Sequence, residues 1–446
     1  HYVWFQEGAK LQALEELADE MLAGRGDRVG HAMLRRDPPV FLPGSGPAGG
    51  EFAADVPAIC AWATGLDRSY VPIQGPPGTG KTYTGAQLVH TLVTAGLRVG
   101  ITAMSHAAID NLMQAVVDRF KEEGDSGKLR AVRKAKEGAL RGIRYVDDNA
   151  GVARSGFNVV AGTTWLFASK PMREVPVDVL VVDEAGQLGL ADTLASTISA
   201  TNVILLGDPQ QLPQVSQASH PGGAGASALE HLLDGDITVP ADRGVLLETT
   251  WRMHPDVCEF ISDVMYGGRL HSHPCCGGQS VAGATGLRWL RAEHKGRSTE
   301  SPEEAAIVVA KVRELLGRPW TDQHGVTRPL TVRDFMVVAP YNDQRRCITE
   351  ALQVDPATRR VEVGTVDKFQ GREAAVVLFS MATSSAEYMP RSADFLFSKN
   401  RLNVAISRAR CLAYLVCTDE LLDTRARNVE EMTLISALCS FVERAA

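Results

Sequence analysis

The sequence predicts an α/β protein with two successive domains, each built on a parallel sheet. Across the 446 residues, short apolar runs alternate with helical patterns from about residue 51 to the end. Strands that alternate with helices form parallel sheets covered by helices on both faces. The length allows two or three domains with sizeable cores. Only the first series of runs carries a glycine-rich phosphate-binding motif.

Residues 1–50 precede these series. Leucine, alanine and methionine recur at helical spacing over residues 7–22, so we expect an amphipathic helix there. The stretch 38–50, PPVFLPGSGPAGG, predicts a connector that joins an N-terminal appendage to the main body. Because the chain starts with His1 rather than Met, we interpret residues 1–50 as the remnant of a longer upstream region.

We place the first domain at residues 51–244. Its apolar runs predict the strands Val71–Ile73, Arg98–Ala103, Phe157–Ala161, Val177–Val182 and Asn202–Leu206. Helical patterns predict helices at Tyr83–Thr94 and Ala107–Phe120. Ligands of such sheets bind at the carboxyl ends of strands, where the motifs below fall.

We place the second domain at residues 245–446. The predicted strands are Val245–Leu247, Leu287–Leu290, Phe335–Ala339, Val361–Val363, Ala374–Met381 and Cys411–Val416. Ser301, Pro302 and Glu304 form the sequence of a capping box at the start of a helix that includes Ala305–Leu316.

The composition limits the functional classes. Hydrophobic residues make up 45% and charged residues 22% of the chain, as in ordinary globular proteins. No apolar run reaches membrane-spanning length, so we expect no membrane partner. The eight cysteines contain no CxxC pair and favour reduced thiols in a cytoplasmic protein. The net charge of −7 means that any nucleic-acid surface must be local.

The most specific motif is GPPGTGKT at residues 75–82, which follows a strand-like run and precedes a helix. It fits the phosphate-loop pattern GxxxxGK[ST], in which backbone N–H groups and a helix N-terminus surround phosphate oxygens. Lys81 supplies a charge for the outer phosphates, and the Thr82 hydroxyl is placed to hold Mg²⁺. The residues expected to bind the nucleotide are Gly75, Pro76, Pro77, Gly78, Thr79, Gly80, Lys81, Thr82 and Tyr83.

A buried strand followed by two carboxylates, VLVVDE, ends at Glu184. Asp183 is expected to hold Mg²⁺, and Glu184 to take a proton from the attacking water as general base. The motif GDPQQL at residues 207–212 follows the next strand, where Gln211 can hydrogen-bond the γ-phosphate.

Two arginine motifs lie in the second domain. WRMHP contains Arg252 among apolar residues, and NVAISRAR contains Arg408 and Arg410. Two residues apart on a helix, Arg408 and Arg410 diverge, so only one reaches a given phosphate easily. Either motif alone would suit a surface ion pair, but closure of the two domains would make them arginine fingers.

Hydroxyl, amide and aromatic side chains at strand ends suit contacts to a sugar–phosphate backbone or to bases. These candidates are Ser105, His106, Thr163, Thr164, Trp165, Tyr341, Gln344, Thr365, Gln370 and Glu373, although the aromatic ones are more often core residues.

An insertion at residues 121–156 carries little apolar pattern but many basic residues. These are Lys128, Arg130, Arg133, Lys134, Lys136, Arg141 and Arg144. They suit either a phosphate backbone or a solvated helix face. The residues His271, His273, Cys275 and Cys276 are too crowded for the usual spacing of zinc ligands.

Nine segments occur in an order that resembles the helicases of superfamily 1B. They are GPPGTGKT, ITAMSHAAIDNL, VVAGTTW, VVDEAGQ, LLGDPQQLPQV, TWRMHP, VAPYNDQ, GTVDKFQGRE and LNVAISRAR, within residues 66–446. The chain is similar to the Upf/Dna-type subgroup, which contains the nonsense-mediated decay helicase and the nuclease-helicase of Okazaki-fragment processing. It also resembles the helicase half of bacterial proteins that join a RecB-like nuclease to such a helicase.

This resemblance implies two RecA-like domains with ATP and Mg²⁺ in the cleft between them. It also implies single-stranded nucleic acid across both domains and 5′-to-3′ movement. By position, Gln211 resembles the γ-phosphate sensor, Arg252 and Arg408 resemble the arginine fingers, and Glu373 resembles the ribose contact. Trp251 stands where many relatives have a tyrosine that stacks on adenine.

Ser105, Thr164 and Thr365 match backbone-contacting positions of the family. Residues 55–70 contain no counterpart of the glutamine that reads adenine in relatives, so base selectivity stays open. The accessory barrel of relatives is not visible in residues 1–70, and the nuclease half is absent from this sequence. We therefore expect no nuclease activity here and a nuclease domain upstream in the full-length protein.

We expect an ATP-driven helicase or translocase on single-stranded nucleic acid. DNA is favoured over RNA only by the resemblance to nuclease fusions. One alternative is a protein-remodelling ATPase of the AAA type, which shares GPPGTGKT. The other is an ATP-dependent nucleic-acid clamp that does not unwind.

Overall fold

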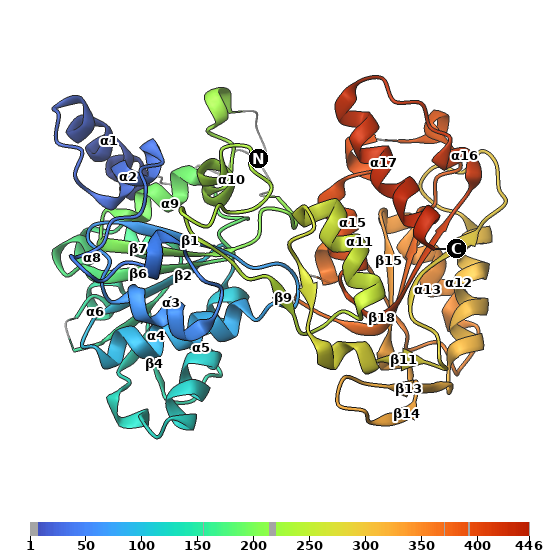
Figure 1. Ribbon diagram of the computed structural model, residues 1–446, viewed down its shortest axis with the longest axis horizontal. Helices are drawn as coiled ribbons and strands as arrows, with labels where there is room; N and C mark the ends of the chain where they lie inside the picture. Colours follow the sequence, from blue (N-terminus) through green and yellow to red (C-terminus); the bar gives the residue numbers. More distant parts are fainter. Residues whose placement is uncertain (1–7, 155, 214–219, 370, 391–392, 446) are drawn as a thin grey trace. The chain divides into compact units, whose positions relative to one another are not determined.

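The computed structural model describes residues 8–154, 156–213, 220–369, 371–390 and 393–445. The chain divides into two compact units, coloured blue to green and yellow to red in Figure 1. The first unit comprises residues up to Pro76, then Gly80–Pro209 and Pro213–Leu247. The second comprises Pro77–Thr79, Gln210–Leu212 and Glu248 onward, so two short loop segments belong with it.

Eight parallel strands form the sheet of the first unit, in the order β4-β3-β5-β2-β6-β7-β1-β8. Their bounds are Tyr70–Gln74 (β1), Val99–Ala103 (β2), Ala131–Lys134 (β3), Ile143–Val146 (β4), Val159–Ala161 (β5), Val177–Asp183 (β6), Ala200–Gly207 (β7) and Val245–Leu246 (β8). The five strands expected in the first series are confirmed. So is the α/β class.

Helices cover both faces of this sheet because its central strands are apolar on both sides. In β7, Ile204 and Leu206 pack into one core, and Val203 and Leu205 pack into the other. The first core includes α3 (Val56–Ala63), α4 (Lys81–Thr94) and α5 (His106–Glu122). The second includes α1 (Gly8–Leu22), α2 (Val29–Arg35), α6 (Asn149–Val152), α7 (Thr164–Phe167), α8 (Lys170–Glu174), α9 (Leu190–Thr197) and α10 (Ala228–Leu233).

Two strands lie where the sequence indicated only a basic insertion. β3 and β4 extend the sheet beyond β5, with Val132 fully buried. These strands are short and rich in arginine and lysine, which concealed them. The run at Val245 also differs from expectation, because Val245 and Leu246 pair with Ile73 and Gln74 of β1. This run therefore closes the first series rather than opening the second.

The N-terminal segment is part of the first unit rather than an appendage. Ala13, Leu17, Val29 and Met33 are buried in its second core. The proline- and glycine-rich stretch is also held in place, since Leu42 N donates to Gly65 O at 2.8 Å. Nearby, the ring of Phe41 lies 5.9 Å from that of Phe52 and 6.1 Å from that of Trp62. Leucine spacing predicted the helix but not its packing against α9.

Five parallel strands form the main sheet of the second unit, in the order β12-β18-β17-β15-β16. Their bounds are Gly286–Arg291 (β12), Phe335–Ala339 (β15), Glu362–Thr365 (β16), Ala374–Ser380 (β17) and Ala409–Cys417 (β18). They confirm the other five predicted strands.

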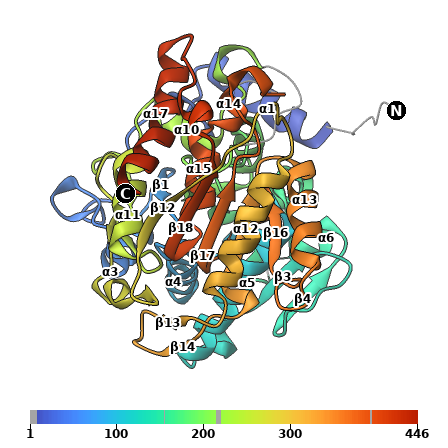
Figure 2. The ribbon, with the colours of Figure 1, turned by 90° about the vertical axis from the view of Figure 1, so that its right-hand side faces the viewer.

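Helices also cover both faces of the second sheet. α12 (Pro302–Leu315) and α13 (Asn342–Gln353) lie along one face (Figure 2). α11 (Pro255–Tyr266), α15 (Lys399–Ile406) and α17 (Val429–Arg444) pack on the other. The remaining short elements are α14 (Ala393–Leu396), α16 (Asp419–Leu422), a parallel pair β9 (Thr249–Thr250) and β10 (His271–Ser272), and an antiparallel sheet of β11 (Ser280–Val281), β13 (Pro319–Thr321) and β14 (Thr327–Pro329).

The predicted capping box of α12 is half correct. The Ser301 hydroxyl accepts from Glu304 N at 3.1 Å, as expected of an N-cap. Glu304, however, turns inward and accepts from His294 Nε2, the Ser380 hydroxyl and Ala382 N. The Ser301 N–H donates instead to the side chain of Gln344 at 2.7 Å. Among the described residues, no helix is both long and apolar enough to cross a bilayer.

Candidate nucleotide site

The phosphate loop connects β1 to α4, as its motif requires. Gly75 N donates to Gly207 O at 2.8 Å, which ties the loop to the neighbouring strand. Gly80 has φ +82° and precedes the first turn of α4, a conformation that favours glycine. The Lys81 ammonium donates to Gly75 O at 2.5 Å and so lies folded over the loop. Thr82 and Tyr83 are exposed on the first turn of α4.

The middle of the loop, Pro77–Thr79, belongs with the second unit. There the Thr250 hydroxyl donates to Pro77 O at 2.9 Å, and Trp251 N donates to Gly78 O at 2.9 Å. Gly78 has φ +78°, and a Cβ on it would lie 2.6 Å from both Arg252 Cβ and Thr250 Oγ1. A side chain at residue 78 would therefore force these segments apart.

Asp183 and Glu184 lie where β6 ends. Asp183 has an unusual pKa, and Glu184 has an unusual backbone conformation. Burial and the neighbouring Glu184 carboxylate raise the pKa of Asp183 to about 7, and Lys81 offsets this only in part. Asp183 Oδ1 accepts from Glu184 N at 2.9 Å. Glu184 has φ +52°, a left-handed conformation that non-glycine residues rarely adopt. Such strain is concentrated at functional sites, and a cation beside Asp183 would relieve the cost of its charge.

Two glycines bring the end of β6 against the end of β7. A Cβ on Gly186 would lie 2.5 Å from Asp208 O, and one on Gly207 would lie 2.7 Å from Ala185 N. Ala185 N donates to Leu206 O at 2.9 Å. The residues after the DE pair and the start of the GDPQQL loop are therefore fixed against each other.

Gln211 is 5% exposed. Two asparagines of α15 hold the backbone beside it within the second unit. Asn400 Nδ2 donates to Gln211 O, and Asn403 Nδ2 donates to Gln210 O at 2.8 Å and to the Tyr266 hydroxyl at 2.9 Å. Sequence reasoning missed these asparagines, although Asn403 begins the NVAISRAR motif. The motif was interpreted only through its arginines.

Arg252 and Glu373 are 121 residues apart in the sequence, and the second unit brings them together. Arg252 Nε donates to Glu373 Oε2 at 2.8 Å, and its Nη1 donates to Ser407 O at 3.1 Å. The other oxygen of Glu373 lies 3.9 Å from Arg410 Nε. The guanidinium of Arg410 is 5.0 Å from the centre of the Trp320 ring. Arg410, rather than Arg408, therefore joins this cluster.

Arg408 is 2% exposed, and two of its guanidinium nitrogens bond backbone carbonyls of its own unit. Its Nε donates to Val404 O at 2.9 Å and its Nη1 to Arg372 O at 3.3 Å. These carbonyls belong to the end of α15 and to the segment before β17. The role of Arg408 as an arginine finger stays a prediction.

The first-unit candidates for nucleic-acid contact differ in accessibility. Ser105 is exposed and caps α5, where its hydroxyl accepts from Ala108 N at 3.1 Å. Thr163 is half-buried and precedes α7, whereas Thr164 is 4% exposed. Trp165 is 39% exposed, but the Lys10 ammonium lies 4.2 Å above its ring.

Two second-unit candidates are core residues instead. Tyr341 is 7% exposed and its ring stacks on Phe395, with centroids 5.6 Å apart. Gln344 is fully buried, and its amide bonds Ser301 and the Ser380 hydroxyl. Both side chains are buried as they stand, and their contact with nucleic acid stays a prediction. Thr365 is half-buried at the end of β16, and Gln370 lies outside the described residues.

The basic segment is only partly available to a ligand. Arg133 is 1% exposed, and it bonds Asp110 at 2.8 Å and His106 Nδ1 at 2.8 Å. Lys128 pairs with Asp125, and Lys134 pairs with Asp147. Lys136 and Arg141 are exposed and make no ion pair within the described chain. Arg144 is also exposed and makes no ion pair within the described residues, but its guanidinium lies 5.9 Å from the centre of the Phe157 ring. Lys136 and Arg141 are therefore two of the basic residues open to a phosphate.

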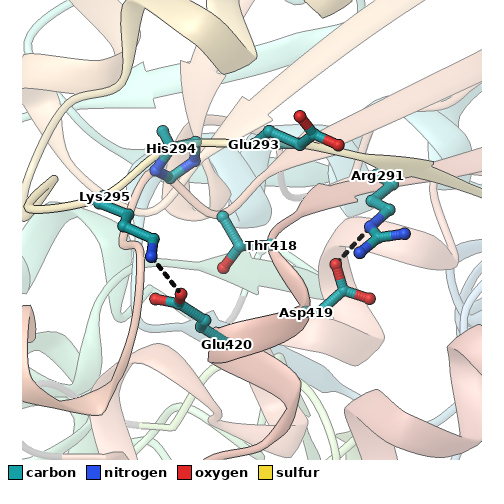
Figure 3. Close-up of a pocket in the computed structure, with 8 residues that line it drawn as sticks. Arg291, Glu293, His294, Lys295, Thr418, Asp419 and Glu420 are labelled. Atoms are coloured by element: carbon teal, nitrogen blue, oxygen red, sulfur yellow. Dashed lines mark hydrogen bonds and ion pairs between the residues drawn. The ribbon is translucent and has the colours of Figure 1, made fainter.

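A pocket of about 440 Å³ elsewhere in the second unit contains none of the predicted site residues. It lies where β12 and β18 end, and Figure 3 shows Arg291 directed toward Asp419 and Lys295 directed toward Glu420. Arg291 pairs with Asp419, and Lys295 lies 3.5 Å from Glu420. Four of its charged side chains are therefore already paired with each other.

Two family models described as AAA domain match the chain, at residues 58–230 and 225–420. The DNA replication ATP-dependent helicase/nuclease JHS1 of Arabidopsis thaliana is 26% identical over 377 residues, covering 77% of this chain and 26% of that protein. The DNA replication ATP-dependent helicase/nuclease DNA2 of Gallus gallus is 30% identical over 359 residues, which cover 77% of this chain and 34% of that protein. The DNA-binding protein SMUBP-2 of Mesocricetus auratus is 24% identical over 476 residues, covering 87% and 46%.

The chain thus spans between about a quarter and about half the length of these curated relatives. A solved helicase, arterivirus nonstructural protein 10, matches with a TM-score of 0.42 and 17% identity over 78% of this chain and 59% of that one. That likeness is too distant to support a conclusion. The sequence matches show P-loop domains similar to those of DNA2 and SMUBP-2.

Proposed function

We propose that this chain is an ATP-driven helicase or translocase that acts on single-stranded nucleic acid. The proposal rests mainly on the arrangement of residues at the end of β6. There a buried carboxyl with a pKa of about 7 and a strained Glu184 follow a phosphate loop in the same sheet. A second parallel α/β unit without a phosphate loop of its own then supplies the arginine cluster.

In this proposal Lys81 leaves Gly75 O for the outer phosphates, and Glu184 takes the proton from the attacking water. Thr82 and Asp183 would hold Mg²⁺, which would neutralise phosphate charge when bound. The fit rests on Asp183, because a buried carboxylate beside a second one is costly unless a cation is near. Gln211 would then hydrogen-bond the γ-phosphate. Its carbonyl already accepts from Asn400, and the carbonyl of Gln210 accepts from Asn403.

The arginines of the second unit are proposed to act on the same triphosphate. Arg252 is the first candidate because its guanidinium is tethered by Glu373, a carboxylate that is 46% exposed and able to exchange partners. Glu373 would then be released to the ribose. Arg408 is the second candidate and needs a larger rearrangement.

The nucleic-acid part of the proposal is supported by the relatives, two of which are described as DNA replication helicase/nucleases and one as DNA-binding. DNA is therefore favoured over RNA. The proposed 5′-to-3′ polarity rests on the resemblance to superfamily 1B helicases. Ser105, Thr163, Thr164 and Thr365 are the proposed backbone contacts. The described structure itself holds no feature that selects deoxyribose.

Steady-state ATP hydrolysis tests the proposal directly. The rate would be measured alone, with single-stranded DNA and with single-stranded RNA. We expect strong stimulation by DNA and little hydrolysis without nucleic acid. Displacement of a strand from duplexes with a 5′ or a 3′ tail would then separate unwinding from a clamp. Indifference of the rate to every nucleic acid would favour a protein-remodelling ATPase.

Two further features of the whole protein are proposed. A nuclease domain upstream in the full-length protein accords with the relatives' description as helicase/nucleases and with the share of their length that this chain covers. A reducing compartment such as the cytoplasm suits the eight cysteines, all of which have free thiols.

A further inference from the structure

Arg410 lies at the start of β18, close to Glu373, and its other contacts hold it there. Its Nη2 donates to the Gln323 side chain at 3.3 Å, and its guanidinium lies 5.0 Å from the centre of the Trp320 ring. Trp320 is 3% exposed in β13, and Gln323 lies in the segment that joins β13 to β14. The Arg410 carbonyl accepts from His254 N at 2.7 Å, within the WRMHP motif. Both ends of Arg410 are therefore fixed by neighbouring segments.

One nitrogen of the Arg410 side chain makes no hydrogen bond. Its Nε is buried and has no hydrogen-bond partner among the residues that the structure describes. Glu373 Oε1 lies 3.9 Å away, which is close enough for an ion pair but too far for a hydrogen bond. The other oxygen of Glu373 accepts from Arg252 Nε at 2.8 Å. Because a buried donor without an acceptor is unfavourable, a closer approach of Glu373 to Arg410 would be favourable.

We propose that Arg410 is a positioning residue that binds the Glu373 carboxylate when Arg252 leaves it for the triphosphate. The inference rests on the proposed function, in which Arg252 exchanges partners, and deepens it. A movement of about 1 Å would bring Arg410 Nε and Glu373 Oε1 to hydrogen-bond distance. One ion pair would then replace another, and Oε2 would become free for the ribose. Without the charge of Arg410, Glu373 would retain Arg252 and turnover would slow.

The test measures kcat and KM for ATP hydrolysis by the whole chain at saturating single-stranded DNA. Arg410→Gln removes the charge but keeps a side chain that can pack on Trp320, and Arg410→Lys keeps the charge. Arg328→Gln is the matched control, because the Arg328 guanidinium also lies beside Trp320, 4.5 Å from the ring centre, but pairs with Asp334. Arg410→Gln is also combined with Glu373→Gln, which removes the carboxylate.

We expect Arg410→Gln to lower kcat by about 5- to 30-fold, on the scale of the coupling between charged groups in contact. KM for ATP should change by less than about twofold, because Arg410 acts through Glu373 rather than on the nucleotide. Arg410→Lys should recover most of the lost rate, and Arg328→Gln should leave kcat unchanged. In the Glu373→Gln background, adding Arg410→Gln should lower kcat by less than about twofold, because no carboxylate is left to pair.

Three results would overturn the inference. The first is an unchanged kcat in Arg410→Gln. The second is an equal loss in Arg410→Lys, because the charge would then be irrelevant. The third is the same loss from Arg410→Gln with and without the Glu373 carboxylate, which would indicate a purely structural role or direct contact with the nucleotide. Failure of the proposed function looks different, because the unmodified chain would then hydrolyse no ATP in the presence of single-stranded DNA.

Discussion

The acidic end of β6 and the arginine cluster of the second unit differ in how their charges are paired. Like charges are adjacent at β6, and opposite charges face each other in the arginine cluster. At β6, Asp183 and Glu184 are adjacent like charges, one of them buried, on a backbone with φ +52° at Glu184. In the arginine cluster, the single Glu373 carboxylate lies 2.8 Å from Arg252 Nε and 3.9 Å from Arg410 Nε, so opposite charges face each other. In the proposed mechanism, the first region would receive a cation, and the second would exchange ion-pair partners before Arg252 acts.

The two regions therefore place different requirements on a ligand. The β6 site is costly on its own and becomes favourable when positive charge arrives. Arg252 is already paired with Glu373, so in the proposed mechanism a phosphate would have to compete with this carboxylate. We therefore expect substitutions in the two regions to separate binding from turnover in different ways.

The largest expected effect is a loss of ATP turnover in Arg252→Ala. An arginine that stabilises the charge of a transferring phosphoryl group contributes about 10³–10⁵ in rate, so turnover should fall on that scale. Steady-state ATP hydrolysis at saturating ATP and single-stranded DNA measures it. Arg269→Ala is the control, because Arg269 forms a half-exposed pair with Glu248 in the same unit. A loss below about tenfold would remove Arg252 from the mechanism.

The next effect is expected for Glu184→Gln. The amide cannot accept the water's proton, so turnover should fall by about 10²–10⁴ while ATP still binds. Hydrolysis rates and nucleotide affinity should be measured on the same preparation. Glu174→Gln, at the end of α8, controls for the loss of an exposed carboxylate. Turnover near the unmodified rate would show that another group is the base.

A smaller effect is expected in the pH dependence of stability. The pKa of Asp183 is about 7 in the folded chain against an ordinary value of 3.8. Between these values the carboxyl is ionised in the unfolded chain but protonated in the folded one. The free energy of unfolding therefore falls as pH rises through this window and stops falling above it.

Asp183→Asn removes that ionisation. In protein free of nucleotide and Mg²⁺, the Tm of this variant minus that of the unmodified chain should grow from about pH 5 to about pH 7.5. Thermal unfolding followed by circular dichroism measures it. A difference that is constant with pH would contradict the raised pKa.

The smallest effect is expected for Lys136→Ala combined with Arg141→Ala. Each phosphate contact on a single strand adds about 0.7 to the slope of log affinity against log salt, so the slope should become shallower by about that amount per contact. Oligo(dT) affinity across a salt series measures it, with the exposed Lys170→Ala as control. An unchanged slope would indicate that these side chains only face solvent.

Sequence patterns predicted the fold where residues near in the chain decide the outcome. All five central strands of the first series and the phosphate loop followed from apolar runs and glycine spacing. β3 and β4 were missed because Arg133 is buried beside Asp110, a partner that no local pattern reveals. Glu304 was misjudged for the same reason, since its contacts include His294 and Ser380.

The sequence predicted which residues would form the site but not which of them would bind each other. Arg252 and Glu373 were each singled out, and neither pattern indicated that they bind each other. Arg408 and Arg410 differ by two positions, yet one faces carbonyls in the interior and the other faces Glu373. Long-range packing decides such orientations, and the stacking of His273 on Trp251 is a further example.

The central claim is that Arg252 acts on the triphosphate only as it reacts. The most direct measurement compares the affinity of Arg252→Ala and of the unmodified chain for ATP and for ADP with aluminium fluoride, which mimics the transferring phosphoryl group. A group that acts in the transition state should leave ATP affinity nearly unchanged and weaken the analogue by about 10² or more. Equal losses for the two ligands, or no loss for the analogue, would contradict the account.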